Sequence, residues 1–349
     1  MIGALGACAT TPRPSATYVY VANADSREVR VSRLDPAGGL TPLQQLPVEG
    51  SAMPMAVSPD KRFLFVSLRT APFRVASLAI DPATGQLRPV GNYPLPDNMA
   101  NISTDRTGRL LFAASYGGNK LSVSRIAADG SVAAAHQVIE TKPMAHSVQA
   151  SPDNRTVLAT SLGGDEVMLF SLDASAGVLT PRTPSSIALP PKSGPRHVVF
   201  GPDGRFAYLL NELDSGIHVL ALDRQTSEWR LVQSDSALPP GFTGKPWGAD
   251  IHVTPDGKFL YASERGSDTL AAFRIDAQSG RIARIANYPT ETQPRGFNID
   301  PGGRYVLVAG QKTDSITVYE IDPAQGSLRS IGRHASGKNP NWIEIVAFP

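Results

Sequence analysis

The stretch Gly201-Pro202-Asp203-Gly204-Arg205-Phe206-Ala207-Tyr208-Leu209 leads from a tight turn into an apolar strand, and its pattern recurs along the chain. Pro fixes φ at one position of a turn, and Asp or Gly completes the bend. We call these segments the Pro-Asp turns, and there are six: Ser58-Pro59-Asp60, Ser103-Thr104-Asp105, Ser151-Pro152-Asp153, Gly201-Pro202-Asp203, Thr254-Pro255-Asp256 and Asp300-Pro301-Gly302. Their recurrence predicts a chain built from repeated β-units.

A second turn signal lies between the Pro-Asp turns, where an aspartate ends an apolar strand. These aspartates are 44 to 53 residues apart, and there are seven: Asp35, Asp81, Asp129, Asp173, Asp223, Asp276 and Asp322. A period of this length with four short strands is typical of a β-propeller blade. We therefore predict an all-β protein, a single seven-bladed β-propeller over residues 17–349. Two separate β-sandwiches would need a linker or a break in the period, and neither is present.

The two ends of this repeat array complement each other. The first repeat has no Pro-Asp turn and opens directly with Thr17-Tyr18-Val19-Tyr20-Val21-Ala22-Asn23. At the other end, Trp342-Ile343-Glu344-Ile345-Val346-Ala347-Phe348 is a strand without a repeat of its own. We expect this C-terminal strand to pair with residues 18–23 and close the ring, which removes the free sheet edges.

Residues 1–16 lie outside the repeat pattern. Leu5-Gly6-Ala7-Cys8 resembles a lipobox, in which the cysteine carries a lipid, but no charged residue precedes it. A signal peptide needs a positive start and an apolar stretch of about 7–15 residues. Two interpretations stay open: a remnant lipoprotein signal with a lipid anchor at Cys8, or an apolar leader on a cytoplasmic protein.

Composition excludes several classes of protein. With 41% hydrophobic residues the chain can bury a large core, so disorder is excluded as its main state. A net charge of +2 is too balanced for a dedicated nucleic-acid binder. No apolar run of 18 residues is present, so no membrane-spanning helix is predicted. The single cysteine excludes internal disulfides and cysteine-based zinc sites.

The strand order of a blade predicts which residues meet. The Pro-Asp turns join the first and second strands, so they share one face of the disc. The opposite face holds the start of each inner strand and the end of each second strand. Those positions are polar and predict a ring around the channel: Asn23, Arg69, Asn101, Tyr116, His146, Arg196, His197, Asn211, Glu212, Asp250, His252, Glu264, Arg265, Arg295, Gln311 and Asn341. Convergent polar groups are what a ligand site needs.

The chemistry available in this ring is limited. Arg196, Arg265 and Arg295 favour a carboxylate or phosphate, since a guanidinium pairs with either through two hydrogen bonds. His146 and Glu212 are the acid/base candidates. A covalent hydrolase is not expected, because the chain has no Gly-x-Ser-x-Gly motif.

The other histidines of the ring have structural interpretations. His146, His197 and His252 show no paired motif such as His-x-x-x-His, so no metal site is predicted. His197 directly follows Arg196, so we expect its side chain on the opposite side of the strand, in packing. Asp250 and His252 share one face of their strand, and we expect an inter-blade hydrogen bond there.

Longer motifs resemble the seven-bladed propeller lactonase family from about residue 18 to 342. The motifs that carry the resemblance include Pro195-Arg196-His197-Val198-Val199-Phe200, Asn211-Glu212-Leu213, Ala249-Asp250-Ile251-His252, Pro294-Arg295-Gly296-Phe297 and Ala309-Gly310-Gln311-Lys312. The related carboxymuconate lactonizing enzymes share the fold but catalyse a cycloisomerisation. The catalytic set implied by that branch falls here on His146, Arg196, Glu212 and Arg265.

The resemblance implies hydrolysis of 6-phospho-D-glucono-1,5-lactone to 6-phospho-D-gluconate in the pentose phosphate pathway, with no cofactor. We expect Glu212 or His146 to take a proton from water. Arg196 and Arg265 would then divide between them the phosphate and the tetrahedral oxyanion. Substrate contacts are expected from four further ring residues, Arg295, Asn211, Gln311 and His252. The alternatives are a cycloisomerase and a non-enzymatic propeller that binds a ligand or a protein, because a fold does not fix a function.

Overall fold

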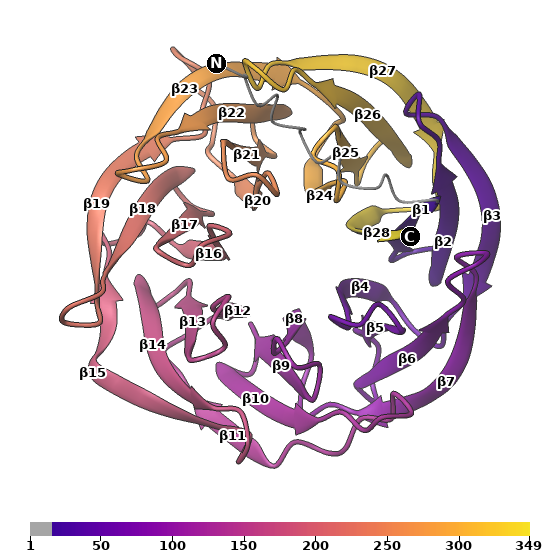
Figure 1. Ribbon diagram of the computed structural model, residues 1–349, viewed down its shortest axis with the longest axis horizontal. Coiled ribbons are helices and arrows are strands. Elements are labelled where there is room, and N and C mark those ends of the chain that lie inside the picture. Colours follow the sequence, from indigo (N-terminus) through magenta and orange to yellow (C-terminus); the bar gives the residue numbers. More distant parts are fainter. Residues whose placement is uncertain (1–15) are drawn as a thin grey trace, which may run out of the picture.

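The structure is a computed structural model that describes residues 16–349, and these form a ring of seven four-stranded antiparallel sheets around a central channel (Figure 1). The described residues contain 28 strands and no helix, so none of them forms a helix that could cross a membrane. The prediction of an all-β, seven-bladed propeller is confirmed. The leader prediction, with Cys8, concerns residues 1–16 and lies almost entirely outside the described part of the chain.

In each blade the innermost strand lines the channel and the outermost strand lies at the outer edge of the disc. From the channel outward, the blades are β28 (Pro340–Phe348), β1 (Ala16–Asn23), β2 (Glu28–Leu34), β3 (Leu40–Pro47); β4 (Ala52–Val57), β5 (Phe63–Leu68), β6 (Arg74–Ile80), β7 (Leu87–Pro94); β8 (Met99–Thr104), β9 (Leu110–Ser115), β10 (Lys120–Arg125), β11 (Gln137–Glu140); β12 (Ala145–Ala150), β13 (Thr156–Ser161), β14 (Glu166–Asp173), β15 (Val178–Ala188); β16 (Pro195–Phe200), β17 (Phe206–Asn211), β18 (Gly216–Asp223), β19 (Glu228–Ser236); β20 (Gly248–Val253), β21 (Phe259–Glu264), β22 (Thr269–Ile275), β23 (Ile282–Pro289); and β24 (Pro294–Ile299), β25 (Tyr305–Gly310), β26 (Ser315–Ile321), β27 (Leu328–Ala335).

The ring closes as the sequence predicts. The C-terminal strand β28 is the inner strand of the first blade and pairs antiparallel with β1, with Ala16 opposite Phe348 and Tyr20 opposite Glu344. Figure 1 shows the indigo start and the yellow end of the chain side by side in this blade. Two segments more than 300 residues apart therefore complete one sheet.

Repeated contacts at the aspartate turns join each blade to the next. The Tyr208 hydroxyl of β17 donates to the carbonyl of Gly280 at 3.1 Å, and that of Tyr261 in β21 donates to Gly326 at 2.9 Å. Gly280 has φ +68°, and a Cβ there would lie 2.3 Å from the Phe206 ring. Glycine is required at this position, because it alone has no Cβ to meet the neighbouring blade. The aspartate-glycine signal in the sequence thus marks the contacts between blades.

Each inner strand has an irregular register close to its first residues. In β12 the pairing shifts between Ala145 and Ser147, and in β16 it shifts between Pro195 and His197. Similar shifts occur at the same place in β4, β8, β20 and β24. A β-bulge leaves a residue unpaired and redirects its side chain. The bulges lie at the end of the channel away from the Pro-Asp turns.

Candidate active site

Two equivalent positions of the repeat supply the side chains at this end of the channel. The second residue of the inner strand, at the bulge, is His146 in β12, Arg196 in β16 and Arg295 in β24. The first residue after the second strand is Arg69, Tyr116, Glu212 or Arg265, according to the blade. We call these seven residues the arginine rim. Every blade from the second to the seventh contributes at least one of them.

Glu212 joins two buried arginines from neighbouring blades. Its Oε2 accepts from Arg196 Nε at 2.8 Å and from Arg265 Nη2 at 3.0 Å. The two arginines are only 1% and 5% exposed. Burial alone would raise the pKa of Glu212, but the charges and hydrogen bonds of Arg196 and Arg265 outweigh burial and lower it. Glu212 is therefore an ionised anchor that fixes both guanidinium groups.

Both arginines keep donors for a ligand. Arg196 donates through Nη1 to the carbonyl of Ala249. Arg265 donates through Nη2 to that of Gly248 at 2.8 Å, and its guanidinium lies 4.0 Å from the centre of the Trp247 ring. Burial, followed by the charge of Arg196, lowers the pKa of Arg265 to about 9. Arg196 Nη2 and Arg265 Nη1 donate to no residue in 16–349.

His146 is a neutral imidazole in the wall of the channel. It is 3% exposed, and its ring lies between those of Tyr116 and His197, at centroid distances of 5.9 and 5.2 Å. Its Nδ1 is buried and has no hydrogen-bond partner among the described residues. Burial, reinforced by the charge of Arg196, holds the pKa of His146 well below its usual value. His146 can therefore accept a proton throughout the neutral pH range.

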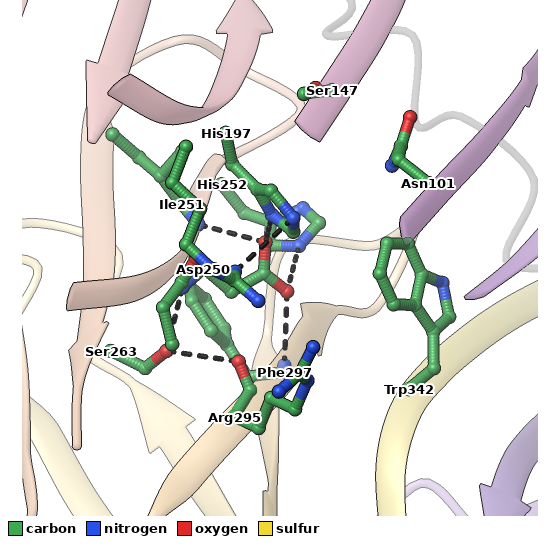
Figure 2. Close-up of polar contacts among 12 residues, drawn as sticks. Asn101, Ser147, His197, Asp250, Ile251, His252, Ser263, Arg295, Phe297 and Trp342 are labelled. Carbon is green, nitrogen blue, oxygen red and sulfur yellow. Dashed lines mark hydrogen bonds and ion pairs between the residues drawn. The ribbon is translucent and has the colours of Figure 1, made fainter. Parts of the chain in front are cut away.

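The prediction that Arg196 and His197 point to opposite sides of their strand is wrong. The bulge at Pro195–His197 brings Arg196 Nη1 to 3.2 Å from His197 Nε2. His197 Nδ1 lies 2.7 Å from Asp250 Oδ1 in the next blade (Figure 2). Burial lowers the pKa of His197 to about 4, so the ring is neutral. With Nδ1–H donating to Asp250, Nε2 accepts from Arg196, and His197 positions the arginine.

The expected inter-blade hydrogen bond at Asp250 and His252 is confirmed, and it involves His197. Asp250 Oδ2 is 3.2 Å from His252 Nε2 and accepts from the Phe297 amide at 3.3 Å. His252 lies deeper in the channel than the arginine rim. It lines a cavity of about 470 Å³ that extends to the Pro-Asp turns at Pro152 and Pro202 and includes Asn101, Ser147 and Gln149. Figure 2 shows Asn101, Ser147 and Trp342 across this space from Asp250.

The other expected substrate contacts differ in their surroundings. Arg295 is half-buried, and its guanidinium makes no hydrogen bond or ion pair with a described residue. Asn211 is fully buried, with Nδ2 at 3.0 Å from His218 Nε2 inside its own blade. Gln311 is held in its turn, where it donates to Asn339 at 2.7 Å and accepts from Gln293 at 3.1 Å. The structure brings Arg295 to the rim and keeps Asn211 and Gln311 in structural contacts.

Arg69 and Tyr116 belong to the rim; the sequence places both in the predicted ring but assigns neither of them a catalytic or substrate-binding role. The signal for both was their repeat position, which they share with Glu212 and Arg265. Among residues 16–349, no group of three or more potential ligands could hold a metal ion.

Comparison with known proteins agrees with this architecture. The family model described as Lactonase, 7-bladed beta-propeller matches residues 15–345. The 6-phosphogluconolactonase of Cronobacter sakazakii is 43% identical over 95% of this chain and 98% of its own length, and that of Serratia proteamaculans is 42% identical over 94% and 98%. The structure of a periplasmic gluconolactonase of Pseudomonas aeruginosa superposes with a TM-score of 0.89 at 31% identity, covering 96% of this chain and 100% of that one. The chain belongs to the seven-bladed β-propeller lactonase family.

Proposed function

We propose that the protein hydrolyses 6-phospho-D-glucono-1,5-lactone to 6-phospho-D-gluconate at the arginine rim. Family membership and the two relatives named 6-phosphogluconolactonase support this reaction. The observation that carries the choice of site is the Glu212 carboxylate, which holds two buried arginines with unused donors near a neutral imidazole. This arrangement combines positively charged hydrogen-bond donors for the lactone carbonyl with a base for the attacking water, and lactone opening needs both.

The arginines act on the carbonyl of the lactone. When water attacks C1, its oxygen bonds to carbon and negative charge develops on the carbonyl oxygen. The free Nη2 group of Arg196 and Nη1 group of Arg265 donate to this oxyanion. Because Glu212 and backbone carbonyls already fix both guanidinium groups, little reorganisation is needed as the charge forms, and this favours the transition state.

His146 is the better general base of the two candidates. Glu212 Oε2 already accepts from two guanidinium groups, so taking up a proton there would weaken both contacts. His146 is neutral, and its Nε2, which is not closed off like Nδ1, makes no hydrogen bond with a described residue. It takes the proton from the attacking water and returns it to the ring oxygen as the bond between C1 and that oxygen breaks. No cofactor enters this scheme.

A cytoplasmic location suits this reaction, because the phosphorylated lactone is made inside the cell. The alternative is export as a lipoprotein anchored through Cys8. Cell fractionation of the native protein, with a Cys8→Ser variant and palmitate labelling, separates the two. A membrane-bound product that loses its label in the variant would contradict the cytoplasmic location.

The proposed reaction is tested by measuring lactone hydrolysis with the spontaneous rate subtracted. The wild type should accelerate hydrolysis of the phosphorylated lactone, and His146→Gln should lower kcat by about 10²–10⁴-fold, as expected for loss of a general base. The control is His136→Gln, since His136 lies next to the outer strand β11 and contacts the carbonyl of Gly177. A wild type that accelerates no lactone but cyclises a muconate would favour the cycloisomerase. Absence of both reactions would favour a binding propeller.

A further inference from the structure

We propose that Arg295, assisted by Arg69, forms a subsite for the phosphate group of the substrate, separate from the arginine pair that acts on the carbonyl. This inference rests on the proposed function and specifies its substrate class, a sugar lactone with a phosphate monoester. It also departs from the expectation that Arg196 or Arg265 holds the phosphate.

The four rim arginines differ in what already occupies them. Arg196 and Arg265 share the Glu212 carboxylate and donate to backbone carbonyls. Arg295 donates to no residue within 16–349, although it lies on an inner strand that lines the channel. Arg69 donates to the Asn98 side-chain oxygen at 2.5 Å and contacts the Met53 sulfur, but it has no carboxylate partner in the described chain. Among the rim arginines, Arg295 and Arg69 are therefore the two without a carboxylate partner in residues 16–349.

The electrostatics of the channel favour an anion at Arg295. Burial lowers the pKa of Arg295 well below its usual value, and the charges of Arg196, Arg265 and Arg69 lower it further. The single rim carboxylate, Glu212, lies with the other pair. A phosphate dianion would supply the missing negative charge, and its oxygens match the two parallel donors of a guanidinium.

The fold fixes Arg295 in this position. A Cβ on Gly296 would lie 2.4 Å from the carbonyl oxygen of Asn341, so the backbone after Arg295 packs directly against the neighbouring inner strand. The Phe297 amide donates to Asp250, which ties the same strand to the blade on the other side. Arg295 belongs to the seventh blade, next to Arg265 in the sixth, and Arg69 to the second. C1 of the lactone can thus face blades four to six while the phosphate on C6 faces blades seven and two.

The test compares kcat/KM for the phosphorylated and unphosphorylated gluconolactone in Arg295→Gln, Arg295→Lys and Arg69→Gln. Arg295→Gln should lower the ratio of the two values by about 10–100-fold, mainly through KM, as expected for a lost charge-assisted contact. Arg295→Lys should restore part of the ratio, since it keeps the charge but not the paired donors. The matched control is Arg27→Gln. Arg27 follows β1 on the same face of the disc, is exposed, and its guanidinium pairs with no described residue, so the ratio should stay at the wild-type value.

Binding of inorganic phosphate, measured by calorimetry, separates this inference from the proposed reaction. The wild type should bind phosphate, and Arg295→Gln should weaken binding at least about tenfold. If the wild type hydrolyses both lactones and Arg295→Gln leaves the ratio unchanged, the subsite is wrong and the reaction stands. If the wild type hydrolyses neither, the proposed reaction fails, and the phosphate measurement alone decides the subsite. Equal loss for both lactones would place Arg295 with the carbonyl and overturn the inference.

Discussion

The two ends of the central channel are built from the same repeat, but only one of them repeats its side chains. At the Pro-Asp end the turns use one contact again and again: the hydroxyl of Ser58, Ser151 or Thr254 donates to the aspartate two residues later at 2.6, 2.5 and 2.7 Å. At the other end the residue after the second strand varies, with six residue types in seven blades: Ala24, Arg69, Tyr116, Leu162, Glu212, Arg265 and Gln311.

This difference separates structural from functional positions. The Pro-Asp turns must satisfy the same backbone groups, and three of the six do so with the same pair, a hydroxyl and an aspartate. In the opposite turns, Arg69, Tyr116, Glu212 and Arg265 belong to the arginine rim, where ligand chemistry can decide their identity. Unlike residues at equivalent positions of a repeat therefore point to a site.

The two ends also differ in charge. The cavity near the Pro-Asp turns is lined mostly by neutral side chains such as Asn101, Ser147 and Gln149, and its carboxylate, Asp250, already contacts His197 and His252. Its arginine, Arg106, donates to the carbonyls of Ala150 and Ser151. The arginine rim holds four guanidinium groups and one carboxylate. An anionic substrate is therefore expected at the rim.

The largest effect is expected from removing the strand on which both ends depend. Deleting residues 341–349 takes away nearly all of β28, so β1 would present an unpaired edge and the apolar cluster that includes Val346 and Phe348 would lose its cover. We expect an unfolded or aggregated protein by circular dichroism and size-exclusion chromatography. A truncated protein with the wild-type melting temperature would show that closure is not needed.

The next effect compares two carboxylates that pair with arginine, the half-buried Glu212 in the rim and the buried Glu291 outside it. Glu212→Gln should lower kcat by about 10²–10³-fold, because both oxyanion donors lose their anchor. Glu291 accepts from Thr313, Ser315, Thr317 and Arg333. Glu291→Gln should cost about 2–3 kcal/mol of unfolding free energy and leave kcat nearly unchanged. Both variants are checked by kcat and by denaturant unfolding. Equal losses of kcat, or equal losses of unfolding free energy, in Glu212→Gln and Glu291→Gln would contradict the comparison.

A smaller effect should follow from Asp250→Asn. The amide no longer enforces the His197 tautomer that accepts from Arg196, so we expect kcat to fall about tenfold with KM little changed. Asp105, a buried aspartate in a Pro-Asp turn, gives the matched control. Asp105→Asn should lower the melting temperature but not kcat. If Asp250→Asn changed only stability, His197 would be a packing residue, as its sequence position suggests.

The smallest effect is expected at Glu344, whose pKa is raised to about 7 by burial. The folded state holds this proton more tightly than the unfolded chain does. The contribution of Glu344 to the free energy of unfolding is therefore fully present below about pH 4.5 and is lost as the pH rises through 7. Glu344→Gln should therefore raise the melting temperature by a few degrees at pH 8 and have little effect at pH 5. An equal shift at both pH values would mean that Glu344 does not titrate in this range.

Sequence reasoning predicted the fold almost completely, because turns and strands repeat locally. It also placed His146, Arg196, Glu212 and Arg265 on one face, since the repeat fixes which end of a strand each residue occupies. It could not place His197, because the bulge at Pro195–His197 depends on pairing between strands. Nor could it distinguish the unpaired Arg295 from the paired Arg196, because that difference arises from contacts between blades.

The most direct test of this account is a crystal structure with 6-phospho-D-gluconate bound. The account predicts the product at the arginine rim, with its carboxylate on Arg196 and Arg265 and its phosphate within hydrogen-bond distance of Arg295. Product in the cavity among Asn101, Ser147 and Gln149, with the rim arginines untouched, would contradict it.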